Sequence, residues 1–219
     1  MLAKINSAAV NGVDGVPVTV EVDIANGLPS FTTVGLPDNS VRESKDRVKA
    51  AIKNSGYGFP GKKITVNLAP ADLKKEGSAF DLPIAVGLLA ASGVVPQDSL
   101  NRFMMVGELS LDGMLRPVPG TLPSAIAAAD LGMEGIIVPE GNAREASLAG
   151  DIRVIYARNL FEIVEGLAGV RTFKEHRNGE TCSQPQLYDL GFENIKGQET
   201  VKRSLEVAAS GFHNVLLKG

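Results

Sequence analysis

The sequence predicts a layered α/β domain, and three patterns indicate it. Expected strands and helices alternate from Lys62 to Gly169, which is typical of a sheet covered by helices. Residues 16–24 alternate between apolar and polar side chains, the period of a strand with one face in solvent. Residues 81–92 are apolar on all sides and almost free of charge, which predicts a helix covered by other elements. The chain of 219 residues is long enough for one full domain and part of a second.

The first part of the chain is expected to hold a hairpin, a short strand, a helix, a further strand and the buried helix. We expect these elements at residues 2–9 with 16–24, 31–34, 38–54, 62–68 and 81–92. Asn11 and Gly12 favour a turn between the first two strands. Asp81 suits the first turn of the buried helix, because its carboxylate meets unsatisfied N–H groups and the positive end of the helix dipole. Pro83 is tolerated there, since a first-turn N–H has no intrahelical partner.

The second part is expected to continue with strands and helices in alternation. We expect strands at residues 103–111, 114–118, 135–139 and 152–156, and helices at residues 122–131, 142–149 and 159–167. Asp112 and Gly113 predict a tight turn between the first two of these strands, because glycine adopts the positive φ that such a turn needs. Residues 96–98 are expected to form a loop, and Asn159 is expected to cap the last helix.

The composition changes after residue 170. Residues 171–190 are polar and show no periodic apolar pattern, which is typical of a linker between domains. The sequence therefore predicts one domain at residues 1–170 and the beginning of another at residues 191–219. In the latter we expect a helix at residues 196–210 and the start of a strand at residues 214–217.

The overall composition is that of a globular protein. Apolar residues make up 44% and charged residues 21% of the chain. No apolar run is long enough to span a bilayer and no signal-peptide core is present, so we expect a cytoplasmic protein without a membrane partner. Cys182 is the only cysteine, which excludes an intrachain disulfide. His176 and His213 are isolated and show no ligand spacing, so no metal site is expected.

The charge is unevenly distributed along the chain. Residues 38–75 carry a net charge of +5, whereas the remainder carries −8. At helical spacing, four basic residues of the expected helix form one stripe: Arg42, Lys45, Lys49 and Lys53. This stripe is either a solvated helix face or a patch for nucleic-acid phosphates or an acidic partner. No aromatic residues are interleaved with it, which argues against base stacking on the stripe.

Three blocks of sequence resemble a known family. They are SFTTVGLPDNSVRESKDRVKAAIKNSG at residues 30–56, KKITVNLAPADLKKEGSAFDLPIA at residues 62–85 and VGELSLDGMLRPVPG at residues 106–120. Residues 1–170 thereby resemble the amino-terminal Lon-protease-like domain of the magnesium-chelatase-like AAA+ proteins, the ComM competence-protein family. The resemblance implies a Lon-protease-like, ribosomal-protein-like fold in which a mixed sheet packs with helices.

Residues 191–219 look like the start of the P-loop AAA+ domain of the same family. In the family, residues at the positions of Ile195, Gly197 and Gln198 approach the adenine, and Gly219 matches the first glycine of the phosphate loop. The lysine and the magnesium-holding hydroxyl of that loop would follow Gly219. We therefore expect a piece of a longer ATPase that uses ATP and Mg²⁺, and we expect no tight ATP binding and no bound cofactor for this piece alone.

The resemblance also raises the question of proteolysis. Lon proteases use a serine–lysine dyad, in which the lysine must lie near the hydroxyl and be partly desolvated. The serine position of the family falls on Ala79 and the lysine position on Pro123, which has no amine. No lysine occurs in residues 76–173 that could replace it. The sequence therefore predicts that the dyad is absent.

Ser78 remains the one weak protease candidate, with Lys74 or Lys75 as its local base. Residues three or four apart across a loop rarely build a buried dyad, so Ser78 is expected to be a hydroxyl at the helix entry. Glu108, in the following hairpin, is expected to be structural.

The resemblance implies a non-proteolytic Lon-like accessory or assembly domain of a hexameric, ATP-driven motor that acts on DNA, as in branch migration during natural transformation. Two alternatives stay open: an ATP-dependent Lon-like serine protease, and a metal-chelatase-type ATPase subunit.

Overall fold

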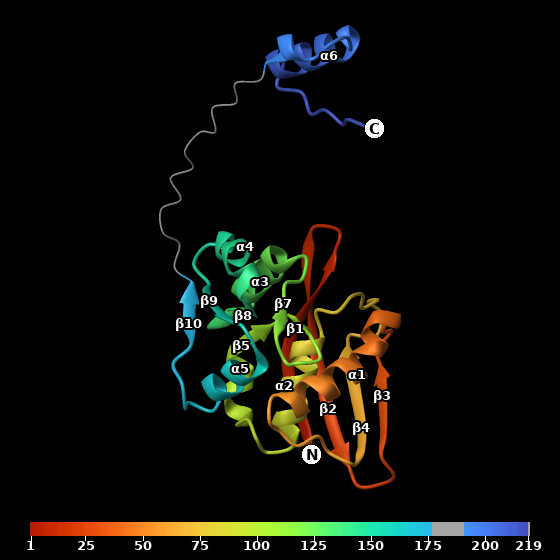
Figure 1. Ribbon diagram of the computed structural model, residues 1–219, viewed down its shortest axis with the longest axis vertical. Coiled ribbons are helices and arrows are strands. Elements are labelled where there is room, and N and C mark those ends of the chain that lie inside the picture. The colour runs from red at the N-terminus through yellow and green to blue at the C-terminus, as the bar shows by residue number, and fades with distance from the viewer. Residues whose placement is uncertain (177–190, 219) are drawn as a thin grey trace. The chain divides into compact units, whose positions relative to one another are not determined.

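The computed structural model describes residues 1–176 and 191–218. The chain divides into two compact units, with the boundary between residues 179 and 180. The first unit contains the sheet and helices α1 to α5 in Figure 1, and the second contains helix α6. Among the described residues, no helix has the length and apolar character needed to cross a membrane.

The first unit is built on an eight-stranded mixed sheet. Its strand order is β10-β9-β8-β5-β1-β2-β4-β3. The bounds of the strands are β1 Leu2–Asn11, β2 Asp14–Ala25, β3 Ser30–Val34, β4 Lys63–Ala69, β5 Phe103–Met105, β8 Gly135–Pro139, β9 Arg153–Ala157 and β10 Lys174–His176. The pairs β1–β2, β2–β4 and β9–β10 are antiparallel, and the other four pairs are parallel. A separate two-stranded ribbon pairs β6 (Glu108–Leu109) with β7 (Leu115–Arg116).

Helices cover both faces of this sheet, so the predicted layered α/β fold is confirmed. The helices are α1 Asn39–Asn54, α2 Asp81–Ala91, α3 Thr121–Asp130, α4 Ala143–Ala146 and α5 Leu160–Leu167. One apolar core joins α1, α2 and α5 to side chains such as Ile5, Ile137 and Ile155. A second core joins α3 and α4 to strand residues that alternate in sequence with those of the first core, such as Ala8 and Ile136. The two cores lie on opposite faces, because successive strand residues point to opposite sides of a sheet.

Helix α2 is the most buried helix of the unit. All eleven of its residues are buried, as its uniformly apolar sequence predicts. A Cβ atom on Gly87 would lie 2.6 Å from side-chain atoms of Ile5 and Val22, so the missing side chain lets α2 approach β1 and β2 closely. Helix α1 packs beside α2 over the same part of the sheet (Figure 1). The basic stripe, formed by Arg42, Lys45, Lys49 and Lys53, therefore lies on the solvent side of the layer that α1 and α2 form.

Three predicted elements are wrong in their extent. The strand expected at residues 103–111 is interrupted, because Gly107 leaves the sheet to donate its N–H to the carbonyl of Ala79 at 2.9 Å. The helix expected at residues 142–149 is α-helical only in α4, between two 3₁₀ turns. The buried Asn142 side chain at its start bonds both backbone polar groups of Val118 at 2.9 Å. The expected loop at residues 96–98 instead begins the 3₁₀ helix Gln97–Arg102.

The sheet extends into the segment that the sequence assigns to the linker. Strand β10 pairs antiparallel with β9, and the Phe173 ring contacts the Phe103 ring edge-on at 5.8 Å. Such a short polar strand has no apolar periodicity of its own, so its local sequence cannot indicate it. The rest of the expected linker, residues 177–190, lies outside the described residues.

The second unit contains helix α6 (Glu199–Ser210) after a 3₁₀ turn at Phe192–Asn194. The helix begins three residues later than predicted, because Gly197 and Gln198 adopt positive φ values of 72° and 59°. The strand expected at residues 214–217 is irregular in the structure. A strand is stable only when a neighbouring strand pairs with it, and no described residue of this unit supplies one.

Candidate functional site

A cleft of about 380 Å³ opens where the Lon resemblance places the protease site. It lies between the end of β1, the loop before α2 and the first turn of α3. Its walls include Ala8, Asp38, Glu76, Ser78, Ala79, Val106 and Ser124. Pro123, at the expected lysine position, precedes Ser124 in the first turn of α3. The structure therefore brings Ser78 and Ala79 to the cleft, as the sequence alignment of the dyad implies.

The hydroxyl of Ser78 is held by a carboxylate. It donates a hydrogen bond to Glu108, which the two-stranded ribbon presents from 30 residues further along the chain. The carbonyl of Ser78 accepts the N–H of Asp81 at 3.1 Å, which fixes the entry to α2. Sequence reasoning missed this role of Glu108, because no local signal relates the hairpin to the loop before α2. A carboxylate that accepts a hydrogen bond from Ser78 orients this hydroxyl but gives the cleft no cation.

The two lysines near Ser78 in sequence make their contacts elsewhere. Lys75 is fully buried, and its ammonium group donates to the carbonyl of Pro70. Burial lowers the pKa of Lys75, because the charged form loses water. Lys74 is exposed and forms an ion pair with Glu76. Neither amine has a hydrogen bond to Ser78, so the described contacts of this loop do not form a serine–lysine dyad.

A buried ion pair lies beside the cleft. Arg47 of α1 donates to both carboxylate oxygens of Asp81, at 2.7 and 3.0 Å, and also to the carbonyl of Ser40. The N–H of Leu109 donates to Asp81 at 3.3 Å. Asp81 was expected to meet the amides of its own helix, but it faces α1 and the ribbon instead. Burial raises the pKa of Asp81 to about 6 despite these partners.

The four residues of the basic stripe are exposed and form no ion pair among the described residues. Other basic side chains of the same unit are paired: Arg102 with Glu134, Arg153 with Glu175, Arg158 with Glu140 and Lys174 with Glu162. Arg47 belongs to the same helix but turns inward to Asp81. The outward face of α1 thus carries four cations without an ion pair to any described residue, with the exposed carboxylates of Glu43 and Asp46 on the same helix.

An aromatic ring lies next to the stripe, which the sequence did not indicate. The ammonium group of Lys49 lies 5.9 Å from the centroid of the Phe59 ring. Phe59 belongs to the loop after α1, which turns back past the last turns of the helix. No aromatic residue is interleaved with the stripe within α1, but Phe59 contacts it from ten residues further along the chain than Lys49.

The expected nucleotide-binding residues lie in the second unit. Ile195 is 45% exposed, and the following turn through Gly197 and Gln198 is also exposed. Gly219 lies outside the described residues. Their approach to a nucleotide stays a prediction. In the described part of the chain, no group of three or more His, Cys, Asp and Glu side chains could hold a metal ion.

These features define a mixed α/β domain with a cleft whose walls, in the part of the chain that the structure describes, include Ser78 and Ser124 and no lysine. Residues 20–142 match the family described as subunit ChlI of Mg-chelatase, and residues 191–219 match the family described as magnesium chelatase, subunit ChlI. The first match covers more than half of the chain. The chain therefore belongs to the Mg-chelatase subunit ChlI family.

Comparison with individual proteins agrees with this assignment. The chain is 46% identical over 218 residues to the uncharacterized protein YifB of Salmonella typhimurium, covering 100% of this chain and 42% of that protein. It is 44% identical over 223 residues to competence protein ComM of Haemophilus influenzae, covering 100% and 43%. Lon protease 2 of Bacillus subtilis is 25% identical over 146 residues, covering 64% and 26%. The expected resemblance to the ComM family and to Lon is confirmed, and the chain spans less than half the length of these relatives.

Proposed function

We propose that this chain is a non-proteolytic, Lon-like accessory and assembly domain of a magnesium-chelatase-like AAA+ ATPase. The complete protein would be a hexameric motor that hydrolyses ATP with Mg²⁺ and acts on DNA, including branch migration during natural transformation. The similarity to competence protein ComM supports action on DNA. The match of residues 191–219 to the family supports a role for Ile195, Gly197 and Gln198 at the adenine, with Gly219 opening the phosphate loop.

The proposal that the protein acts on DNA depends on the unpaired basic stripe of α1. Four cations within about 16 Å of helix match the repeated negative charges of a phosphate backbone. The domain neutralises several other basic side chains with nearby carboxylates, whereas these four form no ion pair within the described chain and follow one face of a single helix. Other unpaired cations, such as Arg116 and Arg144, lie singly on β7 and α4. The stripe therefore supports contact with a polyanion.

The stripe predicts DNA binding that weakens steeply with salt. Four phosphate contacts on duplex DNA give a slope of log K against log salt of about −3.6, or about a hundredfold loss between 50 and 200 mM salt. Changing Arg42, Lys45, Lys49 and Lys53 to Glu should abolish binding of a fluorescent oligonucleotide, measured by anisotropy. Thermal unfolding followed by circular dichroism verifies that the variant is folded.

A matched pair of double variants provides the control. Lys45→Glu with Lys53→Glu and Arg116→Glu with Arg144→Glu change the net charge equally, and all four side chains are exposed and free of ion pairs among the described residues. Only the first pair should weaken binding by tenfold or more. Equal losses in both would show that only net charge matters, and the proposed DNA surface would then be wrong.

The protease alternative is tested separately. The cleft holds Ser78 against Glu108, so we expect no cleavage of casein by this chain. Ser78→Ala should give the same background signal as the unchanged protein. Cleavage that disappears in Ser78→Ala would overturn the non-proteolytic interpretation.

A further inference from the structure

We propose that the surface beside α1 binds single-stranded nucleic acid, with phosphates along the stripe and an unpaired base against Phe59 in the adjoining cavity. This inference rests on the proposed binding of DNA and adds the form of the ligand. It also assigns a site to the base, which the stripe alone does not provide.

The first step is the continuity between the stripe and the cavity. Helix α1 has 16 residues and is about 24 Å long. Asp38, its N-cap, lines the Lon-like cleft at one end, and the loop holding Phe59 follows the other end. Lys49 contacts the Phe59 ring, and Phe59 also lines a second cavity. The cations of α1 thus run from one cleft of the domain to the other.

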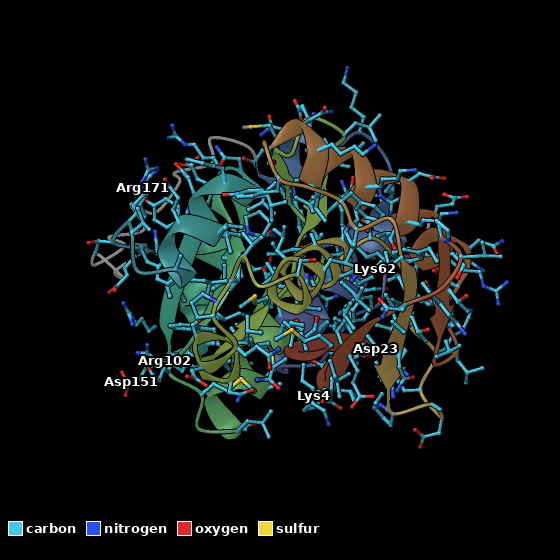
Figure 2. All side chains as sticks on the ribbon, turned by 90° about the horizontal axis from the view of Figure 1, so that it is seen from below. Lys4, Asp23, Lys62, Arg102, Asp151 and Arg171 are labelled. Atoms are coloured by element: carbon cyan, nitrogen blue, oxygen red, sulfur yellow. The ribbon has the colours of Figure 1, made fainter. Side chains whose placement is uncertain are left out.

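The second step is the chemistry of this cavity, which has a volume of about 770 Å³. Its walls combine an aromatic ring, apolar groups and polar groups: Phe59, Ile24, Pro60, Ala91, Asn26, Ser92, Asp23 and Lys62. Asp23 and Lys62, which both line the cavity, are labelled in Figure 2. Small-molecule sites commonly combine such apolar walls with a few polar groups that fix orientation.

The third step is the fit of each ligand group. The cavity wall includes Asp23, and one oxygen of its carboxylate accepts a hydrogen bond from the amino group of Met1 at 3.4 Å. The other oxygen can accept a hydrogen bond from the exocyclic amine of a base. Lys49 contacts the Phe59 ring and Lys62 lines the cavity, so both can attract the phosphates that flank the base. Aromatic rings beside basic side chains are the usual platform for unstacked bases. Bases in a duplex are already stacked and paired, so the cavity selects a single strand.

The absence of tryptophan from this chain permits a direct test. Phe59→Trp introduces a single fluorophore at the proposed stacking position. Titration with a single-stranded oligonucleotide should quench its fluorescence, whereas the same strand without bases should bind through phosphate with little quenching. Phe161→Trp is the matched control, because Phe161 is also accessible to solvent but lies on α5 and does not line the cavity.

Affinity measurements provide a second test of the base site at Phe59. Phe59→Ala should weaken single-strand binding roughly tenfold and change duplex binding little. Phe59→Leu keeps an apolar side chain against the core, so a loss of affinity in this variant cannot be attributed to unfolding. Phe59→Tyr keeps an aromatic ring and should retain most of the affinity.

The outcomes separate this inference from the proposed function. If the stripe variants lose DNA but the Phe59 variants bind normally and Phe59→Trp shows no base-dependent quenching, the base site is wrong and the DNA surface stands. If the unchanged protein prefers duplex to single strand, the base site is also wrong. If it binds neither form, both proposals fail.

Discussion

Asp81 shows how one buried residue can set the pH response of this domain. Its side chain is 1% exposed, whereas that of its partner Arg47 is 23% exposed. The hydrogen bond to Asp81 raises the pKa of Arg47, because the carboxylate stabilises the charged guanidinium group. Burial nevertheless dominates for the carboxylate and raises the pKa of Asp81 from 3.8 to about 6. Asp81 therefore keeps its proton in the folded protein at pH values where the unfolded chain has lost it.

This difference predicts a loss of stability as the pH rises from about 4 to about 6. The folded state binds more protons than the unfolded state in that window, so the free energy of unfolding falls with pH, by up to roughly 3 kcal/mol. Asp81→Asn cannot titrate and should lack this component. Urea unfolding at pH 4, 5, 6 and 7 measures the free energy of unfolding of both proteins. The value of the unchanged protein minus that of Asp81→Asn should fall up to about pH 6 and then level off.

A wild-type minus Asp81→Asn difference that rises with pH would contradict the argument. It would mean that the attraction of Arg47 outweighs the burial of Asp81.

At the scale of elements, the loops before α1 and before α2 are joined to one another. The N–H of Lys75 donates to the carbonyl of Leu36 at 3.2 Å, and the N–H of Asp38 donates to the carbonyl of Lys75 at 3.0 Å. The Asp38 side chain accepts the N–H of Val41 at 2.8 Å as a helix cap and the N–H of Gly77 at 3.3 Å. One carboxylate thus fixes the start of α1 and the loop that carries Ser78.

Asp38→Ala should therefore lower the free energy of unfolding by about 1–3 kcal/mol, because a lost cap costs about 1 kcal/mol and the Gly77 contact adds to it. Asp38→Asn keeps an acceptor for Val41 and should cost less. Urea denaturation measures both, and the exposed neighbour Asn39→Ala is the control. Equal stability of Asp38→Ala and the unchanged protein would show that water replaces both contacts.

Most of the elements could be predicted, because their signals are local. The alternating valines of β2, the cap of α1 and the apolar sequence of α2 each fit within one element. The break at Gly107 could not be predicted, because it depends on a hydrogen bond to Ala79 across 28 residues of sequence. The strand β10 depends in the same way on pairing with β9.

The candidate site could be predicted only in part, for a similar reason. The stripe follows from helical spacing, and the position of Ser78 follows from family resemblance. Its partner Glu108 and the contact of Lys49 with Phe59 are tertiary contacts between separate elements. Sequence spacing carries no information about such pairs unless a motif supplies it.

At the scale of the whole molecule, the first unit holds both apolar cores within residues 1–176. Phe173 is partly buried and packs against the first of these cores. Helix α6 of the second unit leaves Val201 and Val207 exposed, at 41% and 50%. The two units should thus differ greatly in their own stability, since stability follows buried apolar area.

A chain shortened to residues 1–176 should therefore unfold cooperatively, with a midpoint within about 2 °C of that of the full 219-residue chain. Circular dichroism in the far ultraviolet follows the melting of both. A chain ending at residue 170 lacks β10 and Phe173 and should melt several degrees lower. Identical melting of the two shortened chains would show that β10 contributes nothing to the sheet.

The sheet is continuous, but few residue pairs join its two halves. Four strands run from β10 to β5 and four from β1 to β3, and β1 is registered with β5 through the single pair Asn6 and Met104. By contrast, β1 and β2 are registered over ten pairs. The attachment of one half of the sheet to the other therefore depends mainly on the apolar core that Ile5 shares with Ile137 and Ile155. A force applied at β10 would reach α1 through these side-chain contacts and not through a long strand pairing.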